Sequence, residues 1–140
     1  VSHMLNLIRT LLKEDLRKAG IEFAISITPP NLTLAADEKL VEQVLINLIK
    51  NSVEALENVE KSSISVNAFK NEGSVCITVE DNGKGIPSEV LENIFVPFFT
   101  TKKNGSGIGL SISRQIMQMH NGTIKLKSEP GKGTVFSLEF

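Results

Sequence analysis

Apolar residues in the first 60 positions change from one spacing to another, and each spacing predicts an element. From 6 to 20 they recur at helical spacing up to Gly20, a residue type that commonly ends a helix. From 21 to 27 they alternate with polar residues, as in a half-buried strand. Asp37 is a plausible N-cap for a long helix from about 38 to 58. The chain is therefore predicted to begin helix, strand, helix.

The remaining pattern predicts two pairs of strands around one helix. The elements are, in order, strands at 62–70 and 73–81, loops over 82–107, a helix at 107–120, and strands at 122–128 and 133–140. On the last helix, Ile108, Ile112, Ile116 and Met119 are predicted to fall on one face. This order predicts an α+β fold, a two-layer α/β sandwich in which about three helices cover one face of a mixed sheet.

Composition narrows the class of protein. The 140 residues suit one domain, which we expect at 5–140, with "VSHM" at 1–4 resembling an expression-tag remnant. The 15 basic and 16 acidic residues give a net charge of -1, so charge provides no case for a nucleic-acid partner. No apolar run approaches the ~20 residues that span a membrane, and no signal peptide is visible. The one cysteine, Cys76, cannot form an internal disulfide, so we expect a cytoplasmic domain without direct membrane contact.

Two asparagines stand out on the long helix. Asn47 and Asn51 are four residues apart, so they share a face, with Glu54 one turn further. Asparagine is a poor helix former, which leaves two interpretations: a solvated polar edge, or the wall of a site. An amide oxygen is a neutral ligand that suits Mg²⁺, which usually takes only one or two ligands from the protein.

The sequence "DNGKGI" follows a predicted strand that ends at Asp81. Asp81, Gly83 and Gly85 could build a tight turn with no chemistry at all. Alternatively, the Asp81 carboxylate accepts a hydrogen bond inside a pocket, and the glycines allow the backbone to approach a flat base closely. A carboxylate repels phosphate, so its partner should be a donor such as the exocyclic amine of adenine.

A second glycine-rich segment, "GSGIGLS" at 105–111, opens the last helix. It matches neither the Rossmann spacing nor a P-loop, but backbone N–H groups at a helix start still suit phosphate. Lys102 and Lys103 just upstream are either a solvated loop or a source of positive charge. The aromatic run before them, "IFVPFFTTK", is either a hydrophobic plug or the anchor of a mobile flap hinged at "KKNGSG".

The order of these segments resembles the catalytic, ATP-binding domain of sensor histidine kinases in the GHKL superfamily. "NLIKNSVEAL" is similar to the N box, "DNGKGI" to the G1 box, "FVPFF" to the F box and "GSGIGLS" to the G2 box. The resemblance covers residues 5–140 and implies the Bergerat fold, with ATP and Mg²⁺ as cofactors. Ser52 stands where the family usually has alanine, and Asn121 where a glycine pair is common; we expect neither departure to touch the chemistry.

The resemblance also implies a set of site residues. Asn47 and Asn51 would be catalytic, Asn51 would hold Mg²⁺, and Asp81 would hold the adenine amine. The implied ATP-binding residues are Asn47, Asn51, Ala55, Asp81, Gly83, Gly85, Ile86, Phe99, Thr101, Lys102, Gly105, Ser106, Gly107, Ile108, Gly109, Leu110 and Thr134.

The related gyrase, mismatch-repair and chaperone ATPases carry a glutamate at the position of Asn47. An amide cannot act as a general base, so Asn47 favours a kinase over a fast ATPase. The alternatives that stay open are a GHKL ATPase or switch module and an anti-sigma-type serine kinase. Neither His3 nor His120 lies in an acceptor box, so we expect a monomer that cannot phosphorylate itself. Its expected partners are ATP and ADP, a phosphoacceptor histidine domain of the same protein, and a response regulator.

Overall fold

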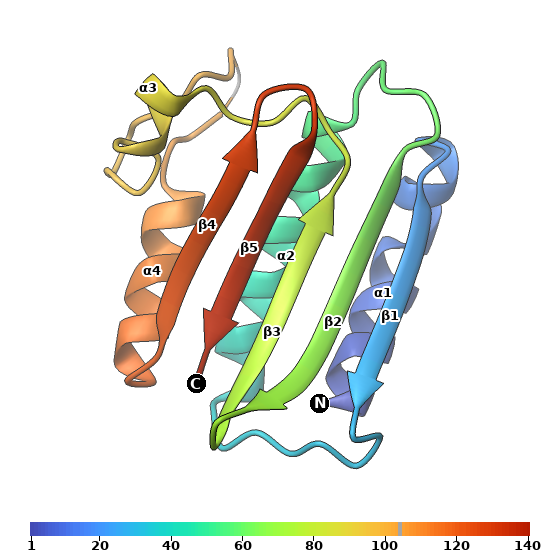
Figure 1. The fold of residues 1–140 in the computed structure, drawn as a ribbon, viewed down its shortest axis with the longest axis vertical. Coiled ribbons are helices and arrows are strands. Elements are labelled where there is room, and N and C mark those ends of the chain that lie inside the picture. The colour runs from blue at the N-terminus through green and yellow to red at the C-terminus, as the bar shows by residue number, and fades with distance from the viewer. Residues whose placement is uncertain (104) are drawn as a thin grey trace.

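The computed structural model describes residues 1–103 and 105–140 and forms two layers. One layer is a five-stranded sheet, and the other is made of helices that lie behind it in Figure 1. The strands are β1 (Glu22–Thr28), β2 (Ser63–Asn71), β3 (Ser74–Asp81), β4 (Thr123–Glu129) and β5 (Gly133–Glu139). The helices are α1 (Ser2–Lys18), α2 (Glu38–Ala55), α3 (Ser88–Leu91) and α4 (Gly109–Met119).

The sheet has the strand order β1-β2-β3-β5-β4 and is mixed. β1 pairs with β2 in parallel, and the other neighbours pair antiparallel. The register sets Asp81 at the end of β3 opposite Thr134 at the start of β5. The predicted α+β sandwich, with three main helices on one face of a mixed sheet, is confirmed.

The core lies between the helices and the covered face of the sheet. The centre of α2 contributes Val41, Val44, Leu45, Leu48 and Ile49, all of them fully buried. Alternate residues of β2 and β3 meet them, because successive side chains of a strand point to opposite faces. Asp37 caps α2 as predicted, its side chain accepting a hydrogen bond from the Leu40 N–H at 3.1 Å. The long helix is therefore fixed at its start and along one face.

Four details differ from the sequence predictions. α1 begins at Ser2, because Met4 continues the buried stripe of that helix and is 4% exposed. α2 ends at Ala55 rather than at 58, where Asn58 has a positive φ. The predicted loop 82–107 contains the short helix α3, which sequence periodicity did not reveal. On α4, the apolar face named from the sequence is buried at Ile116 but not at Met119, which is 72% exposed, and the neighbouring Met117 is buried instead.

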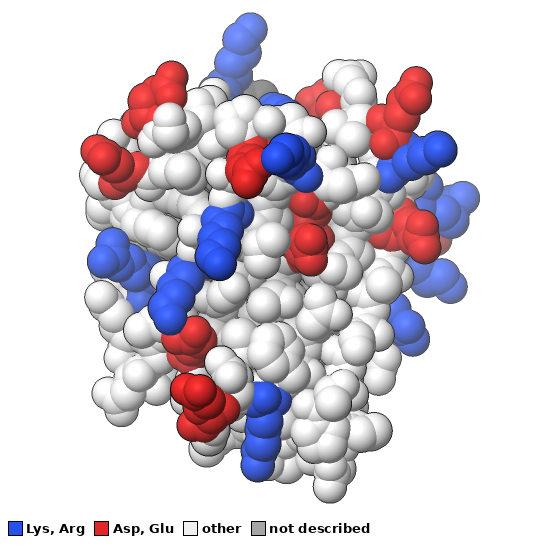
Figure 2. Space-filling view, in the orientation of Figure 1, with Lys and Arg blue, Asp and Glu red and all other residues white. Residues whose placement is uncertain are grey.

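The other face of the sheet is uncovered by helices. Figure 2 shows this face, where blue and red side chains are interspersed and no continuous patch of one sign forms among the described residues. This distribution agrees with the near-zero net charge. Within 1–103 and 105–140, no helix is long and apolar enough to cross a membrane.

Candidate nucleotide site

A cavity of about 1030 Å³ opens at the end of the sheet where β3 finishes and β5 begins. Its walls come from the second half of α2, the loop after β3, α3, residues 99–103 and 105–107, and the start of α4. In Figure 1 this is the end of the molecule that carries α3 and the loop leading into α4. Segments far apart in the sequence therefore meet around one hollow.

Asp81 lies at the base of this cavity and is only 4% exposed. The Ser52 hydroxyl donates a hydrogen bond to Oδ2 at 2.8 Å, and the Gly83 N–H donates to Oδ1 at 2.9 Å. Burial raises the pKa of Asp81, while the hydrogen bonds from Ser52 and from the backbone of Gly83 and Thr134 act to lower it. The side chain is thus a buried acceptor, held by the Ser52 hydroxyl and by the backbone of Gly83 and Thr134.

Ser52, which stands where the family usually has alanine, is in direct contact with Asp81. Ser52 is 1% exposed and lies on the arc of α2 that packs against the sheet, beside Leu48 and Leu56. A buried hydroxyl needs a partner, and the nearest strand end supplies the Asp81 carboxylate. The polar residue in an apolar arc was the available signal.

The two glycines after Asp81 are required by the protein's own packing. A Cβ on Gly83 would lie 2.7 Å from the carbonyl oxygen of Ala55 and 2.8 Å from Asp81 Oδ1. Gly85 has φ +70°, and a Cβ there would collide with the carbonyl oxygen of Glu129. The atoms that a side chain at either position would meet belong to the protein itself. Glycine is therefore needed at Gly83 and Gly85 for packing, whether or not a flat base also approaches them.

Thr134 lies beside Asp81 and is tied to the neighbouring strand. Its hydroxyl shares a 2.9 Å hydrogen bond with Ser128 Oγ, and the Ile86 N–H donates to the same Ser128 oxygen at 2.8 Å. Ile86 and Thr134 both line the cavity. Ser128 therefore fixes the loop after β3 against the β4–β5 turn.

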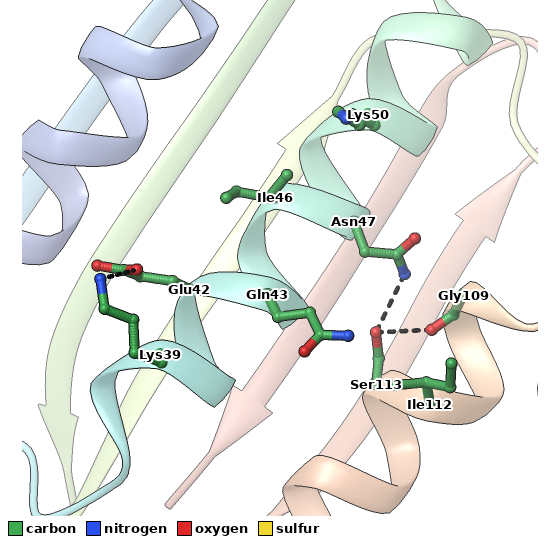
Figure 3. A pocket seen from close by; sticks show the side chains of 9 residues that line it. All are labelled: Lys39, Glu42, Gln43, Ile46, Asn47, Lys50, Gly109, Ile112 and Ser113. Atoms are coloured by element: carbon green, nitrogen blue, oxygen red, sulfur yellow. Dashed lines mark hydrogen bonds and ion pairs between the residues drawn. The ribbon is translucent and has the colours of Figure 1, made fainter.

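Asn47 joins α2 to α4. Its Nδ2 donates to Ser113 Oγ at 3.0 Å, and Ser113 donates in turn to the Gly109 carbonyl at 2.9 Å. Figure 3 shows this chain of contacts beside a groove of about 430 Å³, which Lys39 and Glu42 also line. A Cβ on Gly109 would collide with Asn47 Oδ1. Gly109 thus permits close packing of α4 on α2, in addition to lining the cavity.

Asn51 already accepts a hydrogen bond from a cation. Lys102 Nζ donates to Asn51 Oδ1 at 2.9 Å and forms an ion pair with Glu54. A positive group occupies the position that Asn51 offers, so the residues present fit a magnesium ion there. Among the described residues, no three His, Cys, Asp or Glu side chains cluster as a metal site.

The aromatic segment is joined to the start of α4. The Phe98 N–H donates to the Gly107 carbonyl at 2.8 Å, and a Cβ on Gly107 would lie 2.5 Å from the Phe98 carbonyl carbon. Phe99 lines the cavity, Phe95 packs under the Arg114 guanidinium at 5.5 Å, and Phe98 is 79% exposed. Phe95 and Phe99 are thus packed as a hydrophobic plug would be, while the role of this segment as the anchor of a flap stays a prediction. Position 104, inside the predicted hinge, lies outside the described residues.

The predicted set and the cavity wall overlap closely. The predicted residues that line the cavity are Asn47, Asn51, Ala55, Asp81, Gly85, Ile86, Phe99, Thr101, Lys102, Gly105, Ser106, Gly107, Gly109, Leu110 and Thr134. Gly83 and Ile108 do not line it, because Gly83 packs on Ala55 and Ile108 precedes α4 as its N-cap. Lining residues that the sequence did not single out include Lys50, Ser52, Lys84, Thr100 and Phe136.

His120 is bound to neighbouring backbone. Its Nε2 accepts from the Asp37 N–H at 3.0 Å, and Nδ1 lies 2.7 Å from the Ile116 carbonyl. Because Nε2 accepts, the ring proton belongs on Nδ1, which donates to Ile116. The ring therefore binds the end of α4 and connects it to the start of α2.

Comparison with known proteins identifies the same class for the whole chain. Residues 36–140 match the family described as histidine kinase-, DNA gyrase B- and HSP90-like ATPase. Sporulation kinase A of Bacillus subtilis is 37% identical over 133 residues, which are 95% of this chain and 22% of that protein. The chain thus spans about a fifth of the length of this curated relative.

Solved structures agree with the sequence relatives. The catalytic domain of histidine kinase ThkA superposes with a TM-score of 0.88 at 35% identity, covering 100% of this chain and 91% of that one. A structure of histidine kinase ThkA in complex with the response regulator protein TrrA superposes with a TM-score of 0.84 at 33% identity. That match covers 100% of this chain and 40% of the kinase.

Proposed function

The chain belongs to the family of histidine kinase-, DNA gyrase B- and HSP90-like ATPases, as a histidine kinase catalytic domain, and we propose that its cavity binds Mg-ATP for phosphoryl transfer to a histidine. The observation that carries the proposal is the buried Asp81 carboxylate at the base of the cavity, with Asn51 and the glycine-rich start of α4 at its wall. A buried acceptor suits an amine on a base, and backbone N–H groups at a helix start suit phosphate.

Different residues would bind the base, the phosphates and the metal ion. Asp81 accepts the hydrogen bond from the adenine amine, with Thr134 on the same side of the base. Gly105, Gly107 and Gly109 line the phosphates, together with Lys102 and Lys103. Asn51 holds Mg²⁺ through its amide oxygen, which Lys102 now contacts. The ion would neutralise charge on the β- and γ-phosphates.

The absence of a carboxylate at Asn47 supports transfer over hydrolysis. The amide donates to Ser113 and has no basic oxygen with which to take a proton from water. Glu54, the acid of α2 that lines the cavity, is paired with Lys102. A neutral imidazole needs no such base, because its own lone pair attacks the γ-phosphorus. The bond to the bridging oxygen then breaks, and ADP leaves.

The partners follow from this chemistry. We propose that a phosphoacceptor histidine domain of the same full-length protein receives the phosphoryl group and that a response regulator takes it next. The ThkA–TrrA complex supports the second step for a similar kinase. Such a domain would work in the cytoplasm, where ATP is available.

A transfer assay in trans tests the proposal. The chain is mixed with a separate phosphoacceptor domain from a related histidine kinase and with γ-labelled ATP. We expect acid-labile label on the acceptor histidine and little free phosphate without the acceptor. Sustained release of phosphate by the chain alone would instead favour the ATPase or switch module, and label on a serine would favour the serine kinase.

A further inference from the structure

The Ser52 hydroxyl is the only side-chain group, among the described residues, that donates a hydrogen bond to Asp81. It reaches Oδ2 at 2.8 Å from α2, while the backbone of Gly83 reaches Oδ1 at 2.9 Å from the loop after β3. Together with the backbone donor at Thr134, these two hydrogen bonds restrain rotation of the Asp81 carboxylate about its terminal torsion. The remaining lone pairs are therefore presented in one direction.

Removal of the hydroxyl would leave a buried oxygen without its donor from α2. Ser52 is 1% exposed and Asp81 is 4% exposed, so bulk water cannot readily replace the lost hydrogen bond, and its loss costs free energy. The carboxylate would then be free to turn away from α2, and its pKa would rise further. A protonated carboxyl donates on one oxygen, so it no longer distinguishes an amine from a carbonyl in the way that an ionised one does.

We propose that Ser52 is a positioning residue that keeps the Asp81 carboxylate a fixed, pure acceptor, so that the cavity selects a purine with an exocyclic amine over one with a carbonyl at the same position. This rests on the proposed binding of adenine nucleotide. Ser52 acts on the purine only through Asp81. A residue that merely supported the fold would leave the titration of Asp81 unchanged, whereas loss of Ser52 should change it.

Charged groups around the cavity do not provide an alternative cause. The ionisable side chains that line it with Asp81 are Lys50, Lys84, Lys102, Lys103, Glu54 and Glu57. None of them contributes to the shift in the pKa of Asp81, which comes from burial first and then from Ser52, Gly83 and Thr134. Ser52 is therefore the group through which this titration can be changed by one side-chain substitution.

The first test needs no nucleotide. Carbon-13 NMR follows the Asp81 carboxyl through a pH titration in the wild-type chain, in Ser52→Ala and in Ser62→Ala. Ser62 is the matched control, because it is 8% exposed and donates to the Val59 carbonyl outside the cavity. We expect the pKa of Asp81 to rise in Ser52→Ala and to stay unchanged in Ser62→Ala. An unchanged pKa in Ser52→Ala would overturn the proposal.

The second test measures selectivity with a matched pair of ligands. ADP and inosine diphosphate differ at the purine position where one has an amine and the other a carbonyl. We expect Ser52→Ala to reduce the ratio of the two affinities about tenfold, the size of effect that one hydrogen bond to a charged group has. Ser52→Thr, which keeps a hydroxyl, is expected to retain most of the ratio.

The outcomes separate this inference from the proposed function. If the wild-type chain binds ADP and Ser52→Ala keeps its ratio, Ser52 does not set selectivity, while nucleotide binding stands. If the wild-type chain binds neither nucleotide, the proposed function fails, and the selectivity claim fails with it. The carboxyl titration then still decides whether Ser52 controls Asp81.

Discussion

Replacement of Asp81 by asparagine is expected to separate nucleotide recognition from stability. Asparagine has the same shape but carries one oxygen and one NH₂ group. The oxygen can still accept from the Gly83 N–H, and the NH₂ group then meets the Ser52 hydroxyl, which can accept as well as donate. Toward the cavity, however, the same NH₂ group would face the adenine amine, donor against donor.

The magnitude follows from the lost bond. A hydrogen bond to a charged group contributes about 1.5–3 kcal/mol net, so Asp81→Asn should weaken adenine nucleotide binding by roughly 10- to 150-fold. Isothermal titration of ADP measures this directly. A titration with inosine diphosphate, which offers an acceptor at that position, should show a much smaller loss or a gain.

Stability is expected to move in the opposite direction. Burial raises the pKa of Asp81 above its usual value of 3.8, so the folded chain binds more protons than the unfolded chain above that pH. Stability from this group is therefore lost as pH rises from about 4 through the raised folded-state pKa. Asp81→Asn has no such loss, so its stability relative to the wild type should increase across that window and then level off.

Asp37→Asn is the matched control. Asp37 caps α2 and does not line the cavity, and asparagine caps a helix about as well as aspartate does. It should leave nucleotide binding unchanged. If Asp81→Asn binds ADP as the wild type does, or loses binding only because it unfolds, the role assigned to Asp81 is refuted.

Three further outcomes are expected. Asn51→Ala should weaken nucleotide binding on the order of tenfold with Mg²⁺ present and little in a chelator, and an equal loss in both titrations would count against its role as a ligand. Gly85→Ala should lower the free energy of unfolding by about 1–3 kcal/mol more than Gly20→Ala in thermal or urea unfolding. Both glycines have φ near +70°, but only a Cβ at Gly85 would collide with backbone atoms, those of Glu129 and Pro130. Equal losses in the two variants would contradict this explanation. The chain alone, given γ-labelled ATP, should gain no acid-labile label, since both ring nitrogens of His120 are engaged; label on His120 would contradict this.

Much of the fold could be predicted because local signals and burial agree. Asp37 caps its helix as its sequence position indicates, and the strands at 62–70 and 73–81 form the expected hairpin. Helical spacing placed Ile116 and Met119 on one face of the last helix, but spacing alone cannot tell the covered face of a helix from the face next to it. The packing of Met117 against the sheet decides the orientation. The short α3 has too few residues to show a period.

The site was predicted from the order of its motifs, and the structure changes the physical reasons for several residues. Gly83 and Gly85 are fixed by the protein's own backbone, which no spacing in the sequence reveals. Ser52 meets Asp81 only because α2 crosses the end of β3, a contact between positions 29 residues apart. Lys102 reaches Asn51 across 51 residues for the same kind of reason. Long-range contacts of this sort need the folded chain.

Isothermal titration of Mg-ATP into the chain tests directly whether the cavity binds Mg-ATP and holds it without rapid turnover. We expect a single-site curve in which each injection returns to the baseline. Sustained heat flow after binding would mean hydrolysis and would move the ATPase interpretation ahead of the kinase. If titration with ATP and titration with ADP both give no heat of binding, the assignment of the cavity as a nucleotide site is contradicted.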